Sequence, residues 1–273
     1  MDRQKDILGN DMTEIVAEIG VNHNGNIRLA KDLIDIAIDA GCDAVKFQAW
    51  GENRFPDIEH LRLKPGGLKY LFDYCEEMGI AWWCTPFDDW SVGFLKDCGM
   101  TTWKIPSGMV TNFDYLKKIK AAKPKRIIMS TGMCTEDEIY KSLPFLKGGV
   151  ELLVLQCTTG YPTKLDEINL GVFDVPEHYR GKWFFDGLSD HSGLIEIPVA
   201  AVALGAKMIE VHITHDKAQD GPDHKASLEP QELRTMVRMC RNVEKAMGDG
   251  EKKPTPRELK VRDKIRATMG CKV

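Results

Sequence analysis

Eight short apolar runs alternate with segments of helical periodicity, and this alternation constrains the fold more than any other feature. Continuous apolar runs are typical of strands that are buried on both faces, as in a parallel sheet covered by helices. The runs span residues 13–20, 43–50, 80–86, 101–107, 126–132, 150–158, 183–191 and 208–215. Helical patterns lie at 29–40, 68–78, 88–98, 112–122, 135–146, 194–204 and 230–247, and an irregular segment to residue 179 follows the sixth run.

Eight strand–helix units in a chain of 273 residues predict a closed (β/α)8 TIM barrel, which typically needs ~250 residues. An open doubly wound sheet is the alternative, but no GxGxxG motif follows the first run. We assign residues 1–250 to the barrel and residues 251–273 to a linker-like tail or helix. A capping box formed by Thr135 and Glu138 is expected to start the helix at 135–146.

Composition excludes several classes of protein. The formal net charge is −4, so no basic surplus suggests a nucleic-acid partner, and no run is long and apolar enough to cross a membrane. The first residues, MDRQKDILGND, lack an apolar signal core, which indicates a cytoplasmic protein. The eight cysteines form no CxxC pair and are expected to be free thiols.

Polar residues cluster where the apolar runs end. In a barrel the carboxyl ends of the strands line the mouth of the active site. The candidates at these ends are Glu18, Lys46, Gln48, Thr85, Lys104, Ser107, Ser130, Tyr161, Ser189, His191 and His212.

Lys46 and Lys104 lie in otherwise apolar strands, where an unpaired charge is costly. Each could simply pair with a carboxylate such as Glu18. Two lysines beside Ser107 and the turn at 130–132 favour an anion site, in which small residues leave backbone N–H groups free for phosphate oxygens. A Schiff-base lysine is a further hypothesis. Glu18 is the candidate general base, with charge compensation as its alternative role.

His191 and His212 end neighbouring strands, and Asp223 follows in a loop rich in Gly, Pro and Asp. Lone histidines are more often core residues, but two at adjacent strand ends beside an anion site favour a metal site with positions open for water or substrate. His215 and His224 are expected to be solvated in the polar loop. Tyr161 could pack within its loop or lie over the substrate.

Several motifs together resemble one family, the N-acetylneuraminate (sialic acid) synthases and their relatives that make other nonulosonic acids. The motifs cover most of residues 13–250. They are AEIGVNHNGN (17–26), DAVKFQ (43–48), CTPFD (84–88), WKIPSG (103–108), STGM (130–133), CTTGYP (157–162), LSDHSG (188–193), EVHIT (210–214) and GPDHKASLEP (221–230).

The resemblance implies a barrel transferase that condenses phosphoenolpyruvate with an open-chain acylamino-hexose, an aldose such as N-acetylmannosamine, and releases phosphate. It implies that His191 and His212 bind a divalent metal ion. The expected ion is Mn²⁺, with Mg²⁺ or Co²⁺ as alternatives. The implied phosphoenolpyruvate contacts are Lys46, Thr85, Lys104, Ser107, Ser130 and Ser189. The groups implied around the acceptor or the attacking water are Glu18, Gln48, Tyr161 and Asp223.

Three departures from the family pattern concern the acceptor side. The family normally carries a C-terminal antifreeze-like domain, which we expect to be lacking after the linker-like residues 248–266. Residues 49–66 form a shorter segment than in typical members, and Thr159 replaces an asparagine or serine. A homodimer and a separate capping protein are therefore considered as partners. The alternatives to the condensing enzyme are a Schiff-base aldolase or lyase and a non-catalytic ligand-binding relative.

Overall fold

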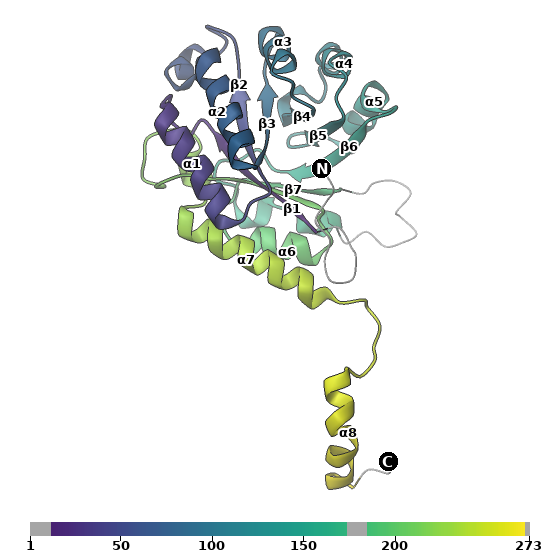
Figure 1. The fold of residues 1–273 in the computed structure, drawn as a ribbon. Coiled ribbons are helices and arrows are strands. Elements are labelled where there is room, and N and C mark those ends of the chain that lie inside the picture. The colour runs from purple at the N-terminus through teal and green to yellow at the C-terminus, as the bar shows by residue number, and fades with distance from the viewer. Residues whose placement is uncertain (1–11, 174–184, 271–273) are drawn as a thin grey trace.

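The computed structural model describes residues 12–173 and 185–270, and its eight parallel strands close into a barrel in chain order. Each strand pairs with the next, and β8 pairs with β1. Figure 1 shows the strands at the centre with helices around them. The expected (β/α)8 barrel is confirmed. The strands are β1 Glu14–Gly20, β2 Ala44–Ala49, β3 Ala81–Pro86, β4 Thr102–Ile105, β5 Arg126–Ser130, β6 Glu151–Cys157, β7 Gly187–Asp190 and β8 Met208–His212.

The helices follow the expected periodicity closely, and short 3-10 turns lie between some elements. The α-helices are α1 Ile27–Ala40, α2 Pro65–Met78, α3 Asp89–Asp97, α4 Phe113–Ala121, α5 Glu136–Leu146, α6 Glu196–Ala203, α7 Pro230–Met247 and α8 Pro256–Thr268. The 3-10 turns are η1 Pro56–Leu61, η2 Ser107–Met109, η3 Leu165–Glu167, η4 Leu170–Phe173 and η6 His224–Ala226.

Most expected strands run one to three residues too long, because residues at one or both ends belong to the adjoining loops. Ser107 begins η2 instead of ending a strand, and β8 ends at His212 instead of residue 215. Residues 183 and 184 of the seventh expected strand lie outside the described residues. The expected capping box before α5 is present, since the Thr135 side chain accepts from the Glu138 N–H and the Glu138 carboxylate accepts from the Thr135 N–H.

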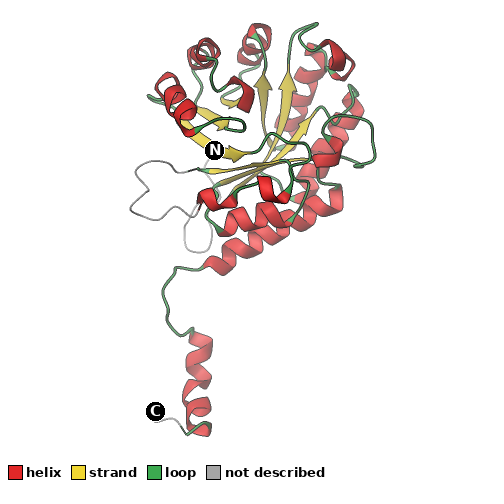
Figure 2. Cartoon of the chain, turned by 180° about the vertical axis from the view of Figure 1, so that it is seen from behind, coloured by secondary structure: helices red, strands yellow, loops and turns green. Residues whose placement is uncertain are grey.

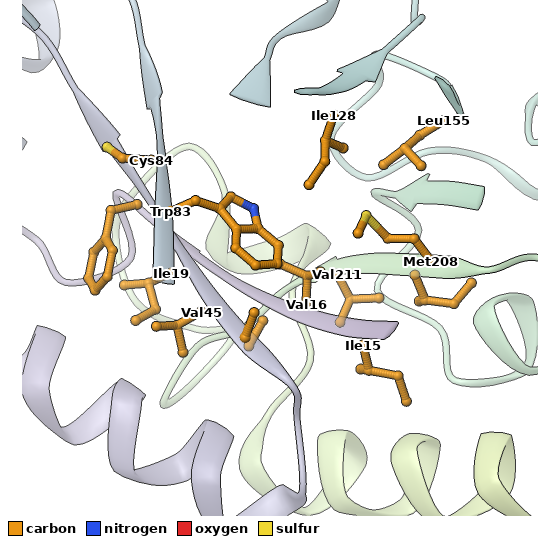
Figure 3. Packing of buried hydrophobic residues seen from close by; sticks show 14 of the residues in the cluster. Ile15, Val16, Ile19, Val45, Trp83, Cys84, Ile128, Leu155, Met208 and Val211 are labelled. Atoms are coloured by element: carbon orange, nitrogen blue, oxygen red, sulfur yellow. The ribbon is translucent and has the colours of Figure 1, made fainter. Parts of the chain in front are cut away.

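The barrel interior is filled in layers, which follow from the alternation of side chains along each strand. At the amino ends of the strands, Arg126 of β5 forms an ion pair with Glu14 of β1 at 2.5 Å. Figure 3 shows the next layer, where the Trp83 indole reaches into the barrel toward Val16. The core at the amino ends is therefore closed, and the buried polar groups gather at the carboxyl ends of the strands.

Helix α8 lies apart from the barrel in both Figure 1 and the reverse view of Figure 2. All residues from 251 to 270 are exposed except Arg262, which is half-buried. No helix among the described residues is both long and apolar enough to cross a membrane. The seven described cysteines are free thiols, as expected, and Cys271 lies outside the described residues.

Gly187 should be irreplaceable in the barrel wall. A Cβ at this position would lie 2.2 Å from the Met208 backbone oxygen, so β7 and β8 could not keep their pairing. We expect Gly187→Ala to lower the free energy of unfolding by about 1–3 kcal/mol in urea titrations. Gly93→Ala is the control, because nothing lies within 4 Å of a Cβ there and alanine favours the helix. Equal stability of the two variants would contradict this account.

Candidate active site

The polar side chains expected at the mouth come together there. Residues at alternate positions of a strand point the same way, and this places Glu18, Lys46, Lys104, Glu210 and His212 in the upper barrel. The pairing register puts Glu18 opposite both Lys46 of β2 and His212 of β8. All five side chains are buried.

Each of the two lysines is paired with a carboxylate. The Lys46 amine lies 3.0 Å from Glu18 Oε2 and donates to Thr85 Oγ1 at 3.1 Å. The Lys104 amine donates to both carboxylate oxygens of Glu210 at 2.8 Å and to the Ser130 hydroxyl at 2.7 Å. The ion pairs meet the requirement that buried charges have partners.

Glu210 was missed by the sequence analysis and is the centre of this cluster. Its Oε1 accepts from Lys104 and from the Ser189 hydroxyl at 3.0 Å, and lies 3.7 Å from the Lys46 amine. The sequence did contain a signal for Glu210. This glutamate lies in the apolar run MIEVH two residues before His212, so the two side chains face the same side of the strand. Glu210 thus joins three of the predicted phosphoenolpyruvate contacts.

The charges in the cluster shift one another's titration. Burial alone would raise the pKa of Glu210, but the two lysines lower it to about 2. Burial would lower the pKa of Lys46, yet the carboxylates of Glu18 and Glu210 raise it. The pKa of Lys104 is lowered, mainly by burial. Burial also raises the pKa of Glu18 despite the attraction of Lys46, which suits a group that exchanges protons.

The small-residue turn after β5 differs from the expectation. The Gly132 N–H is not free for phosphate, because it donates to the Ser107 hydroxyl at 2.9 Å. A Cβ at Gly132 would lie 2.2 Å from Thr159 Oγ1, so the turn is closely packed. Ser107 also contacts the Cys157 thiol at 3.6 Å. The turn therefore fixes the Ser107 side chain at the mouth.

His191 and His212 lie side by side, with ring centroids 5.2 Å apart. His191 Nδ1 lies 2.9 Å from the Thr158 carbonyl oxygen, to which it donates, and Nε2 lies 3.0 Å from the Tyr161 hydroxyl. A backbone carbonyl that accepts from one ring nitrogen typically orients the other toward a metal ion. Tyr161 thus faces the imidazoles instead of packing within its own loop.

The remaining donors are an imidazole nitrogen and a carboxylate, which are groups of the kind that bind divalent ions. His212 Nδ1 is buried without a hydrogen-bond partner, and the Asp223 carboxylate lies 3.5 Å from it. Burial and the charge of His191 hold the pKa of His212 well below 6.5, so its nitrogen lone pair is available. No three His, Cys, Asp or Glu side chains of the described residues converge as a complete metal site. Water and substrate would have to supply the other ligands.

The remaining candidate, Gln48, and two further histidines also have defined positions in the structure. Gln48 donates to Glu18 Oε1 at 2.8 Å and so orients the carboxylate. His224 is buried, which contradicts the expected solvation, because it bonds Thr214 Oγ1 at 2.7 Å and Asn24 Oδ1 at 3.2 Å. His215 is half-buried instead of solvated, with its Nε2 3.5 Å from the Leu29 carbonyl oxygen.

The loop that carries Asp223 is fastened to the loop after β1. The buried Asn22 amide donates to the Ile213 carbonyl and to the Ser227 hydroxyl, which in turn donates to the Asp223 carbonyl. His23 in the same loop is buried, and its Nδ1 accepts the Gly25 N–H at 3.0 Å. These bonds hold Asp223 over the mouth.

Comparisons with known proteins identify the family to which the chain belongs. The model of the NeuB family matches residues 51–252. An N,N'-diacetyllegionaminic acid synthase of Campylobacter jejuni is 42% identical over 95% of this chain and 85% of its own length. Human N-acetylneuraminate-9-phosphate synthase is 36% identical over 95% of this chain and 78% of its own length.

A solved structure also matches over nearly its whole length. The N-acetylneuraminic acid synthetase of Leptospira borgpetersenii, crystallised with citrate, superposes with a TM-score of 0.83 at 31% identity. The match covers 97% of this chain and 94% of that chain.

Replacing Glu210 by glutamine should destabilise the protein strongly. Two ammonium groups would then share one buried carboxylate, and breaking a buried pair costs about 3–5 kcal/mol. Chemical unfolding at pH 7 measures the loss. Asp89→Asn is the control, since Asp89 pairs with Lys118 at the exposed surface and should cost less than about 1 kcal/mol. A loss from Glu210→Gln no larger than the control would show that Glu210 does not compensate the lysines.

His23 should make stability pH-dependent. Burial lowers the pKa of His23 from 6.5 to about 4, so the folded state binds its proton less readily than the unfolded chain. Its stabilisation is complete above pH 6.5 and is lost as the pH falls toward 4, by about 3 kcal/mol in total. Urea midpoints between pH 8 and 4.5 measure this loss. His23→Asn, whose amide oxygen can accept the Gly25 N–H, should flatten the dependence, and an unchanged slope would contradict the assignment.

Proposed function

The chain belongs to the NeuB family of sialic acid synthases, and from that premise we propose that it condenses phosphoenolpyruvate with an open-chain aldose. The product would be a nonulosonic-type 3-deoxy-2-keto acid, with release of phosphate. The observation that carries this proposal is the buried cluster of Lys46, Lys104 and Glu210 at the barrel mouth. Buried ionisable groups with shifted pKa values that gather at the carboxyl ends of barrel strands are typical of a catalytic site.

Lys46 and Lys104 would bind the carboxylate and phosphate of phosphoenolpyruvate. Thr85 and Ser130 each already accept a hydrogen bond from one of these amines, and Ser189 donates to Glu210. The serine and threonine hydroxyls can rotate to donate to substrate oxygens. As the phosphate leaves, its growing charge would be stabilised by the same two amines.

The charge balance of the cluster supports the proposal that a divalent ion binds in the same site. The two lysines are already balanced by Glu18 and Glu210, so phosphoenolpyruvate would bring an excess of negative charge into a buried cluster. His191 and His212 would hold the ion, and Asp223 lies beside His212. Mn²⁺ is the ion we propose. When bound, the ion would polarise the aldehyde oxygen of the acceptor as a Lewis acid.

Glu18, Gln48, Tyr161 and Asp223 would serve the acceptor and the attacking water. Glu18 is the general base we propose, because it is buried, its pKa is raised, and Gln48 and Lys46 fix its direction. Tyr161 and Asp223 flank the imidazoles and would orient the acceptor hydroxyls. We propose an acylamino-hexose as the acceptor, since the relatives named above are synthases of acylamino sugar acids.

Phosphate release tests the proposal directly. The protein is incubated with phosphoenolpyruvate, Mn²⁺ and a panel of aldoses that includes N-acetylmannosamine. We expect release with at least one aldose, loss of release with EDTA, and its return with added Mn²⁺. Release that resists EDTA would contradict the role of the metal. Trapping of a keto acid on Lys46 or Lys104 by borohydride would instead support a Schiff-base aldolase.

Lys104→Met should lower kcat/KM for phosphoenolpyruvate by about 100-fold or more, because it removes a preorganised charge from the leaving phosphate. Lys117→Met is the matched control. Lys117 pairs with Asp114 at the exposed surface, so its loss should leave kcat/KM within about twofold. Similar kinetics for the two variants would exclude Lys104 from the donor site.

A further inference from the structure

A cavity of about 730 Å³ lies beyond the carboxyl ends of β2 and β3, between the loop after β2 and the starts of α3 and α4. None of the twelve predicted site residues lines it. We propose that this outer cavity binds a neutral sugar ring as an accessory saccharide site. The site goes beyond the proposed reaction and would bind sugar whether or not the barrel is active.

An aromatic side chain gives the outer cavity an apolar surface. Trp90 of α3 is 39% exposed, and its ring stacks on Phe94 with centroids 5.3 Å apart and planes 7° apart. Phe87 also lines the cavity and packs edge-on against Phe55 with centroids 5.4 Å apart. Both aromatic rings are thus held in place before any ligand arrives, which lowers the entropic cost of binding.

Charge makes an anionic ligand unsuitable. Four carboxylates line the outer cavity, those of Glu52, Asp88, Asp89 and Asp114, against only two cationic side chains. Lys118 is already bound to Asp89, so Arg54 alone among the lining cations could face a phosphate or carboxylate, beside four carboxylates. The outer cavity is therefore a poor site for phosphoenolpyruvate or for an acidic product.

The carboxylates are also poor sites for a cation, since each already has a partner. Asp89 pairs with Lys118 at 2.6 Å, and Asp114 with Lys117 at 2.9 Å. Asp88 accepts the N–H groups of Gly51 and Ser91, at 2.6 and 2.8 Å.

Glu52 pairs with Arg62 at 3.2 Å. A metal ion or ammonium group would have to displace these cations and N–H donors. Neither kind of charged ligand thus suits the outer cavity.

The hydrogen-bonding groups that remain available on the cavity wall suit a ligand with hydroxyl groups. Each of the three paired carboxylates Glu52, Asp89 and Asp114 retains acceptor capacity. Arg54 lies over the Phe55 ring and forms no ion pair with any described residue, and Asn112 uses its amide oxygen to cap α4 while its N–H₂ donates to no described residue. A sugar hydroxyl both donates and accepts, so such a mixed rim beside an indole suits a neutral polyhydroxylated ring.

The test uses sugars that cannot react in the barrel. Methyl glycosides of N-acetylglucosamine, N-acetylmannosamine and glucose have no free aldehyde, so they report binding alone. Ligand-observed NMR titrations compare the full chain with Trp90→Ala, Trp90→Phe and Asp223→Asn. We expect at least one glycoside to bind, with affinity reduced tenfold or more by Trp90→Ala, retained by Trp90→Phe and unchanged by Asp223→Asn.

Three results would overturn the outer saccharide site. The first is no binding of any glycoside. The second is equal binding to the wild type and to Trp90→Ala. The third is tighter binding of N-acetylneuraminate than of the neutral glycosides, lost in Trp90→Ala, which would mark an anion site. Phosphate release by the wild type is measured separately, so failure of the outer site is distinct from failure of the proposed reaction.

Discussion

The structure depends on keeping two ammonium groups charged inside a closed barrel. Lys46 and Lys104 are removed from water, and the low polarity there makes an unpaired charge very costly. Glu18 and Glu210 supply the compensation from β1 and β8, the pair of strands that closes the ring. The cluster therefore ties barrel closure to the placement of the groups that would bind substrate.

The pairing of the two lysines with Glu18 and Glu210 also limits how an anionic substrate could bind. Glu210 holds Lys104 with both oxygens and Ser189 with one, so it occupies the directions in which an anion would approach. Phosphoenolpyruvate would have to share these donors with Glu210, and the added charge would favour a cation nearby. His212 Nδ1 has no hydrogen-bond partner among the described residues, and the His191 ring is oriented by the Thr158 carbonyl, so these two imidazoles are the ligands we propose for that cation.

Much of this arrangement could be predicted from the sequence, because strand alternation and buried runs follow local rules. Lys46, Lys104, His191 and His212 were expected at one mouth, and the structure places them there, while their chemical roles stay predictions. Glu210 was missed because it lies within an apolar run, although its spacing from His212 carries the necessary signal. Solvation of His224 was a wrong expectation, since its partners Thr214 and Asn24 come from packed loops.

The outer cavity could not be predicted from the sequence, and neither could the burial of His224, because both depend on how separate loops pack together. Its walls come from three loops and helix starts whose relative positions no short-range pattern encodes. Composition could have flagged Trp90 only as one aromatic residue among many. The approach of separate loops is set by the barrel as a whole, so it needs coordinates.

A crystal structure with phosphoenolpyruvate and Mn²⁺ bound would test the central claim most directly. The account predicts phosphoenolpyruvate oxygens within hydrogen-bond distance of the amines of both Lys46 and Lys104, and an anomalous manganese peak between His191 and His212. Phosphoenolpyruvate bound away from either amine, with the two lysines still engaged only by Glu18 and Glu210, would contradict it.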